Sequence, residues 1–274
     1  MSKPDMALVS PSRGLTVGLV VAAIAGVCGV VLSFVSAVRE LSELGVGDSP
    51  STVLGVPWSV VGIAVFAAIL GFAVVLLQRD PSAAPHRRVA MGTTLFIAGM
   101  IGLWAAWALT ADKVITVTSP QADLDCNFTL LVQCGANLTS WQGSILGFPN
   151  PLLGIGGWVA ALVMGVALVS AIPLRRALWA WFTLGVTGAM ALVIWLISQS
   201  IFVLGTLCPW CMVTWAVTIP VFWLCWAELL RRSPQRRLAA AAGAVLGWIP
   251  LLTVASYLVV AIIAQLRLDV IAYL

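Results

Sequence analysis

The chain has 274 residues, of which 61% are hydrophobic and only 9% charged, and its mean hydropathy is +1.08. A soluble domain carries about 25% charged residues, so this composition excludes a water-soluble fold. The formal net charge of +4 reflects membrane topology, because the basic residues are confined to particular connections; it does not indicate a nucleic-acid partner.

Seven apolar stretches are long enough to cross a bilayer. Each crossing helix needs roughly 20 apolar residues, since backbone groups in lipid must be hydrogen-bonded within the segment itself. The stretches lie at about residues 15–38, 55–77, 91–111, 148–172, 177–204, 208–229 and 238–265. We therefore expect an all-α integral membrane protein with about seven transmembrane helices. The first run has no small-x-small cleavage site and exceeds a signal-peptide core, so we expect it to be retained.

The basic residues predict the orientation, because cytoplasmic loops retain Lys and Arg. Eleven of the 14 basic residues fall in alternate connections, whereas the opposite connections hold three basic and seven acidic residues. The eleven are Lys3, Arg13, Arg79, Arg87, Arg88, Arg175, Arg176, Arg231, Arg232, Arg236 and Arg237. The two long loops at about 39–54 and 112–147 are therefore predicted to lie outside the cytoplasm.

Two segments that open inward-running helices resemble each other. Residues 53–63 read VLGVPWSVVGI and residues 145–155 read ILGFPNPLLGI. The similarity suggests that residues 1–80 are a degenerate copy of a later helix-loop-helix unit, without its cysteines. The alternative is that Gly-x-Pro simply begins both helices, since proline is common in a first helical turn.

Six cysteines sort by depth. Cys28 and Cys225 fall inside apolar helices, where an isolated thiol usually acts as a small packing residue. Cys126 and Cys134 lie in the outer 112–147 loop, and Cys208 and Cys211 begin the sixth predicted helix at the same membrane face. That face is the oxidising side, where disulfides persist.

The Cys-Pro-Trp-Cys run at residues 208–211 has the spacing of a reversible dithiol. Pro209 suits the first helical position, which places Cys208 near the N-cap, where free N–H groups stabilise a thiolate. The same spacing also occurs in zinc sites. Here the dithiol stands at the edge of the bilayer, where quinones diffuse, and this favours redox chemistry.

Cys126 and Cys134 flank a polar stretch that we expect to swing as a mobile loop. Thiol-disulfide exchange needs an attacking thiolate, an accessible sulfur and a resolving cysteine, and two pairs of cysteines provide such a relay. The alternatives are a static brace or a four-cysteine zinc site. Trp215 lies one helical turn after Cys211, and we expect both residues to line one pocket. Gln199 could face that pocket or hydrogen-bond a neighbouring helix.

Residues from about 91 to 265 resemble the vitamin K epoxide reductase family, particularly its actinobacterial members. The motifs that carry the resemblance are Asp-Cys-Asn at 125–127 with Cys-Gly at 134–135, Ser-Trp-Gln-Gly at 140–143, GFPNPLLG at 147–154 and LCPWCM at 207–212. Their order and spacing agree with the family. The resemblance implies a four-helix bundle around a quinone.

The resemblance also implies roles for individual residues. Cys211 would lie beside the quinone ring, Cys208 would exchange with Cys134, and Cys126 would exchange with a thioredoxin-like partner. Asn150 resembles the asparagine that hydrogen-bonds the quinone carbonyl, and Ser140 resembles the serine or threonine of the family loop.

Two features depart from the family pattern. Trp215 stands where animal members commonly have tyrosine, so an indole N–H replaces a phenol. The helices of residues 1–80 are additional to the family core, which we place at 88–230, and residues 231–274 add a C-terminal transmembrane helix.

The sequence thus predicts a cell-membrane thiol:quinone oxidoreductase that oxidises a DsbA-like or thioredoxin-like protein and reduces menaquinone or ubiquinone without a metal. In a eukaryote, the same residues would predict reduction of vitamin K or its epoxide in the endoplasmic reticulum. The alternatives from other classes are a scaffold or transporter subunit with structural disulfides and an outward metal-binding protein.

Overall fold

The computed structural model describes residues 13–43, 52–53, 56–57, 62–63, 85–119, 121, 124, 126–170, 172 and 174–273. The long helices are α1 (Arg13–Glu43), α3 (Pro85–Thr118), α5 (Pro151–Val169), α6 (Arg176–Gln199), α7 (Pro209–Arg231) and α9 (Ile249–Leu268). Shorter elements are β1 (Thr52–Val53), β2 (Val56–Pro57), α4 (Gly135–Thr139), η1 (Trp141–Ser144), η2 (Ser200–Leu204), α8 (Arg236–Val245), η3 (Leu246–Trp248) and η4 (Val270–Tyr273).

Within this described part of the chain, five helical segments are apolar and long enough to span a bilayer. They are Val89–Thr118, Pro151–Val169, Arg176–Leu204, Pro209–Arg231 and Arg236–Leu268. They correspond to the last five predicted spans, and the protein is an all-α membrane protein. Helix α1 covers the first predicted span, whereas the second, at 55–77, lies outside the described residues except for 56–57 and 62–63.

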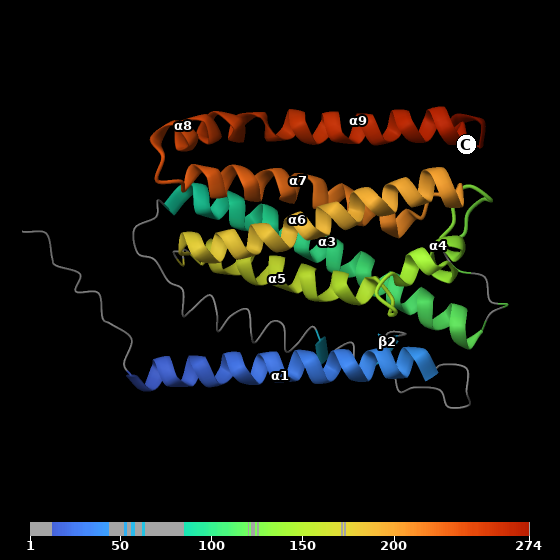
Figure 1. Ribbon diagram of the computed structural model, residues 1–274, viewed down its shortest axis with the longest axis horizontal. Helices are drawn as coiled ribbons and strands as arrows, with labels where there is room; N and C mark the ends of the chain where they lie inside the picture. Colours follow the sequence, from blue (N-terminus) through green and yellow to red (C-terminus); the bar gives the residue numbers. More distant parts are fainter. Residues whose placement is uncertain are drawn as a thin grey trace, which may run out of the picture.

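Helices α3, α5, α6 and α7 form a four-helix bundle (Figure 1). Helix α3 packs along α5, and α7 lies against both α3 and α6. Helices α8 and α9 form an outer layer on α7, where Trp223 Nε1 donates a hydrogen bond to Ser256 Oγ at 3.3 Å. The bundle is therefore closed by α7 on one side, while α5 and α6 make little contact with each other.

Glycines allow α3 and α5 to approach closely. A Cβ added to Gly165 would lie 2.6 Å from the backbone nitrogen of Phe96 and 2.8 Å from the carbonyl oxygen of Gly92. Small residues at such contacts let membrane helices pack backbone to backbone. This close pair forms one wall of the bundle.

Helix α3 is longer than the sequence predicted. The apolar run ends near residue 111, but the helix continues through Asp112 and Lys113 to Thr118. The predicted start of the outer loop at 112 was therefore wrong, because a polar residue can extend a helix when protein partners satisfy its side chain. Those partners are part of the site described below.

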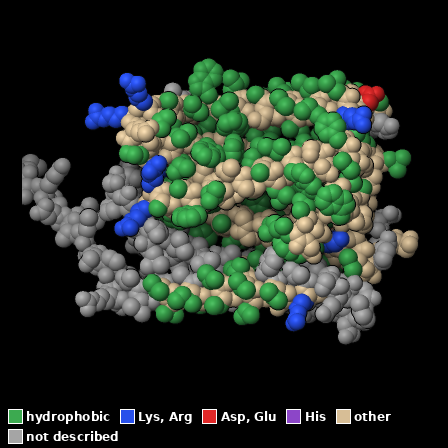
Figure 2. All heavy atoms as spheres, in the orientation of Figure 1, with side chains coloured by type: hydrophobic (Ala, Val, Ile, Leu, Met, Phe, Trp, Pro, Cys, Tyr) green, Lys and Arg blue, Asp and Glu red, His purple; other side chains and the backbone are tan. Residues whose placement is uncertain are grey.

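Hydrophobic side chains cover much of the bundle surface in Figure 2, as lipid requires, and the Lys and Arg side chains gather mainly at the end where α7 passes into α8. Helix α4 and the C-terminus lie at the other end (Figure 1). This arrangement agrees with the alternation of basic connections in the sequence. The assignment of the α4 end to the extracytoplasmic side stays a prediction.

Candidate functional site

Cys208 is the N-cap residue of α7. Its backbone is extended, with φ −85° and ψ 120°, and Pro209 begins the helix. The Cys208 Sγ accepts a hydrogen bond from the backbone N–H of Cys211 at 3.3 Å. A sulfur at this position can carry negative charge because the first-turn N–H groups point toward it. The predicted helix start is thus confirmed.

A short backbone pairing brings the outer loop to the start of α7. Val132 and Leu207 form a parallel bridge. In this pairing, the Gln133 N–H donates to Leu207 O at 3.0 Å, and the Leu207 N–H donates to Leu131 O at 2.7 Å. Because Cys134 and Cys208 follow directly, the pairing places them next to each other.

The four outer cysteines form one cluster. Cys126 and Cys134 are joined by a disulfide with a Cα–Cα distance of 5.7 Å, while Cys208 and Cys211 are free thiols. The Cys134 and Cys208 sulfurs lie 3.5 Å apart. The sulfurs of Cys126, Cys134 and Cys208 therefore form a row in space from the loop to α7, and Cys211 lies one helical turn beyond Cys208.

Cys208 is buried, although it begins a helix at the predicted outer membrane face. Its exposed fraction is 0%, as is that of Cys134, because the loop covers the end of α7 and packs Leu124 and Leu138 over the sulfurs. In this arrangement Cys134 is the cysteine in contact with Cys208. Accessibility to solvent does not explain the pairing, whereas contact with Cys134 does.

Asn127 orders the loop around the disulfide. Its Oδ1 accepts hydrogen bonds from the backbone N–H groups of Cys134, at 3.0 Å, and Gly135, at 3.2 Å. These are first-turn donors of α4 that would otherwise need water or another cap. The loop that we expected to swing is docked in this structure.

Asp112 is a site residue that sequence reasoning missed. Its Oδ2 lies 3.2 Å from Cys126 Sγ, and the side chain is buried. Next to it, Lys113 Nζ donates to Leu138 O at 2.7 Å and fastens α4 to α3. The available signal was a carboxylate at the end of an apolar run, one loop away from a cysteine.

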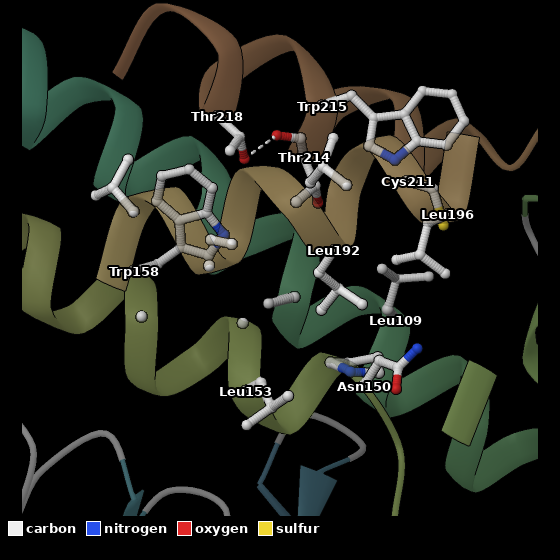
Figure 3. A pocket seen from close by; sticks show the side chains of 18 of the residues that line it. Leu109, Asn150, Leu153, Trp158, Leu192, Leu196, Cys211, Thr214, Trp215 and Thr218 are labelled. Atoms are coloured by element: carbon white, nitrogen blue, oxygen red, sulfur yellow. Dashed lines mark hydrogen bonds between the residues drawn. The ribbon is translucent and has the colours of Figure 1, made fainter. Parts of the chain in front are cut away.

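A cavity of about 590 Å³ lies within the four-helix bundle, and its walls are mostly apolar. Cys211 is part of its lining and, in Figure 3, lies with Trp215 at the end near Leu109 and Leu196. The cavity therefore adjoins the sulfur that is most remote from the loop.

Two of the three predicted quinone-binding residues line this cavity, namely Asn150 and Trp215. Ser140 is not among its lining residues; its Oγ donates to Asn137 O at 2.9 Å and supports the turn between α4 and η1. The Asn150 amide also has a local task, because Nδ2 donates to Gln142 O at 2.7 Å and Oδ1 accepts from Ile145 N–H at 3.2 Å. Gln199 accepts a hydrogen bond from Gln142 at 3.5 Å. Of its two predicted roles, this is the hydrogen bond to a neighbouring helix.

The remaining two cysteines stand apart from this cluster. Cys225 is fully buried within α7 and belongs to the main apolar core, as expected of a packing residue. Cys28 is exposed on α1, so it faces outward from that helix and does not pack as predicted.

A metal has one candidate group among the residues that the structure describes. Asp112, Cys126 and Cys134 place three ligand atoms within 4.8 Å of one another. In the state seen here, however, the two sulfurs are bonded to each other, and a disulfide sulfur is not the thiolate that binds a metal. The same geometry suits a proton acceptor beside an exchanging thiol.

A membrane bundle that holds a disulfide against a C-x-x-C dithiol, with an apolar cavity below, defines a membrane thiol-disulfide oxidoreductase. Residues 93–226 match the model of the vitamin K epoxide reductase family. This segment therefore belongs to the vitamin K epoxide reductase family, which confirms the resemblance found in its motifs. No curated protein and no solved structure was found to match the chain.

Proposed function

We propose that this protein passes electrons from the dithiol of a secreted thioredoxin-fold or DsbA-like protein to menaquinone or ubiquinone. One observation carries the proposal: a row of sulfurs leads from the outer loop through the 3.5 Å Cys134–Cys208 contact to Cys211 at the cavity. Electrons need such a chain of exchangeable sulfurs between a protein substrate in water and a quinone in lipid.

The loop half of the reaction is disulfide exchange. Cys126 is only 3% exposed, so the loop must open for a partner thiolate to attack it. Cys134 then leaves as a thiolate, and the second partner thiolate completes the partner disulfide and releases Cys126. The Cys134 thiolate attacks Cys208 of an oxidised C-x-x-C pair and releases Cys211. Attack of Cys126 on Cys134 restores the loop disulfide and leaves Cys208 and Cys211 as a dithiol, the redox state found in the structure.

The membrane half of the reaction is quinone reduction. Cys208 and Cys211 form their disulfide, and the quinone takes up the two electrons and two protons to become a quinol. Cys211 is the thiol at the cavity, and Trp215 and Asn150 supply polar groups beside it. No metal is required for this electron balance.

The shape of the cavity supports a quinone with a long isoprenoid tail. Its lining follows α6 from Leu196 to Trp181, a rise of about 22 Å along the helix. Glycines on α5 and α6 leave this region open, because a Cβ at Gly157, Gly185 or Gly188 would meet nothing within 4 Å. A tail could lie between these two helices and reach the lipid.

Two features support an extracytoplasmic protein partner. The loop presents apolar side chains close to Cys126, with Phe128 at 68% and Leu130 at 87% exposure, which suits docking of an apolar surface around a partner's active site. The distribution of basic residues predicts that this loop lies outside the cytoplasm.

The test is quinone-dependent oxidation of a reduced thioredoxin-fold protein by the purified enzyme. We expect stoichiometric formation of quinol and partner disulfide, with Cys126→Ser blocking partner oxidation and Cys211→Ser blocking quinol formation. Inert cysteines and no turnover with any quinone would favour the scaffold alternative. Turnover of vitamin K epoxide, and not of a bacterial-type quinone, would favour the eukaryotic reading.

A further inference from the structure

Gln142 lies in η1, the short helix between α4 and α5. It is among the residues that line the cavity, and only 4% of it is exposed. Its backbone is fixed, because Asn150 Nδ2 donates to the Gln142 carbonyl oxygen at 2.7 Å. The side chain therefore stands at a defined place between η1 and the end of α6.

One end of the Gln142 amide is bonded and the other is not. Nε2 donates to Gln199 Oε1 at 3.5 Å, whereas Oε1 is buried and has no hydrogen-bond partner among the described residues. A buried amide oxygen that has lost water and gained no donor is unfavourable. Because Gln142 is a lining residue, a ligand in the cavity could bring the missing donor if the side chain turns slightly toward it.

The other amide and hydroxyl side chains that line the cavity, those of Asn137, Asn150, Thr214 and Thr218, already have hydrogen-bond partners in the protein. Thr214 and Thr218 donate to the carbonyl oxygens of Trp210, at 3.1 Å, and Thr214, at 2.7 Å; the second bond is drawn in Figure 3. Both ends of the Asn150 amide bind backbone atoms. The unused acceptor at Gln142 therefore distinguishes it from these neighbours.

We infer that Gln142 Oε1 accepts a hydrogen bond from a ring hydroxyl of the bound quinol, an inference that rests on the proposed quinone reduction. A quinone offers only carbonyl acceptors, whereas a quinol offers hydroxyl donors. Gln142 therefore favours the reduced ligand. By linkage, tighter binding of the quinol than of the quinone draws electrons from Cys208 and Cys211 toward the ring.

Gln199 fixes which end of the amide faces the ligand. Rotation of the Gln142 amide by half a turn would present Nε2 to the cavity and favour a quinone carbonyl instead. That rotation breaks the bond to Gln199 Oε1 unless Gln199 turns as well. Gln199 is thus a positioning residue, and its loss should reduce the preference for quinol.

The experiment measures binding without turnover. Full-length Cys208→Ser/Cys211→Ser protein in detergent is dialysed anaerobically against a short-chain 1,4-naphthoquinone or against its quinol. We expect the quinol to bind more tightly than the quinone. Gln142→Met, which keeps the side-chain length, should weaken quinol binding about fivefold, the equivalent of one ordinary hydrogen bond, and change quinone binding less than about twofold.

Two further variants separate hydrogen bonding from packing. Gln142→Glu retains an acceptor oxygen and should retain the quinol preference, and Gln265→Leu, at the exposed end of α9, should behave as the parent. Equal loss of both ligands in Gln142→Met, or unchanged quinol binding in a variant whose Cys126–Cys134 disulfide has formed, overturns the inference. If the parent binds neither form, the proposed quinone reduction fails and this inference fails with it.

Discussion

Removing Cys211 should trap the loop on α7. In Cys211→Ser, Cys208 has no partner within its own C-x-x-C motif, but its sulfur already lies 3.5 Å from that of Cys134. A disulfide requires about 2.05 Å, so the two sulfurs must approach by about 1.5 Å. Attack of Cys208 on Cys134 forms the new bond and releases Cys126 as a thiolate, with no change in the number of electrons.

The extent of trapping depends on the thiol that can reverse the exchange. Cys126 can attack Cys134 again in Cys211→Ser, so this variant should contain a mixture. Cys126→Ser/Cys211→Ser has no resolving thiol, and oxidation should join Cys134 to Cys208 almost completely, because intramolecular pairs react at effective concentrations of roughly mM or more. Quinone turnover should fall by roughly a hundredfold or more in both variants.

Peptide mapping without reductant, after acid quenching and alkylation, identifies the linked peptides. Cys134→Ser/Cys211→Ser is the matched control, since it leaves Cys126 to pair with Cys208 and the structure records no direct contact between their sulfurs among the described residues. A Cys126–Cys208 bond that forms as completely as the Cys134–Cys208 bond would refute the assigned order of the relay.

Three other substitutions test the site from different sides. Asp112→Asn removes the carboxylate beside Cys126 and should slow partner oxidation on the order of tenfold to a hundredfold, as measured by rapid quenching. Reduction of quinone by a prereduced C-x-x-C pair should keep the parental rate. Slowing of both steps would point to a structural role. Gly188→Leu should raise KM for a long-tailed quinone about tenfold, because the tail would lose the burial of about two CH₂ groups. KM for a tailless quinone should not change. Gly243→Leu in α8 is the control. Gln121→Cys should react with an impermeant maleimide in intact cells and Arg236→Cys only after permeabilisation, and the opposite pattern would reverse the topology.

The sequence predicted the last five membrane spans and the meeting of the cysteines because both depend on local pattern. Apolar length identifies a crossing helix, and alternate loops meet at one membrane face. The pairing of Val132 with Leu207 was not predictable, because it joins two short irregular segments with no periodicity. This pairing brings the loop over Cys208 and helps to bury it.

The polar contacts of the site escaped prediction for a related reason. Asp112 lies beyond the apolar run, so a composition criterion assigned it to the loop although it belongs to α3. Gln142 could be recognised as part of a motif, but its partner Gln199 is 57 residues away, and its unused oxygen is visible only when all neighbours are placed. Individual hydrogen bonds therefore needed the three-dimensional structure.

The N-terminal helices should be dispensable for the chemistry. Among the described residues, all that line the cavity lie between Ala106 and Val221, within the segment that matches the family. Ala37 and Ile63 do belong to the main apolar cluster, so removal of residues 1–87 uncovers apolar side chains. Lipid tails are as apolar as the side chains they would replace, and the cost in stability should be modest.

Loss of an even number of predicted spans also preserves the orientation of the remaining helices. A shortened chain that begins at Arg88 should therefore insert with the same topology, form the Cys126–Cys134 disulfide and reduce quinone within about twofold of the full chain, as expected when a change far from the site leaves the barrier unaltered. The measurement is quinol formation per inserted protein, with disulfide formation verified by peptide mapping. A shortened protein that forms the disulfide yet reduces no quinone would mean that the N-terminal helices complete the cavity, and would extend the catalytic unit beyond the four-helix bundle.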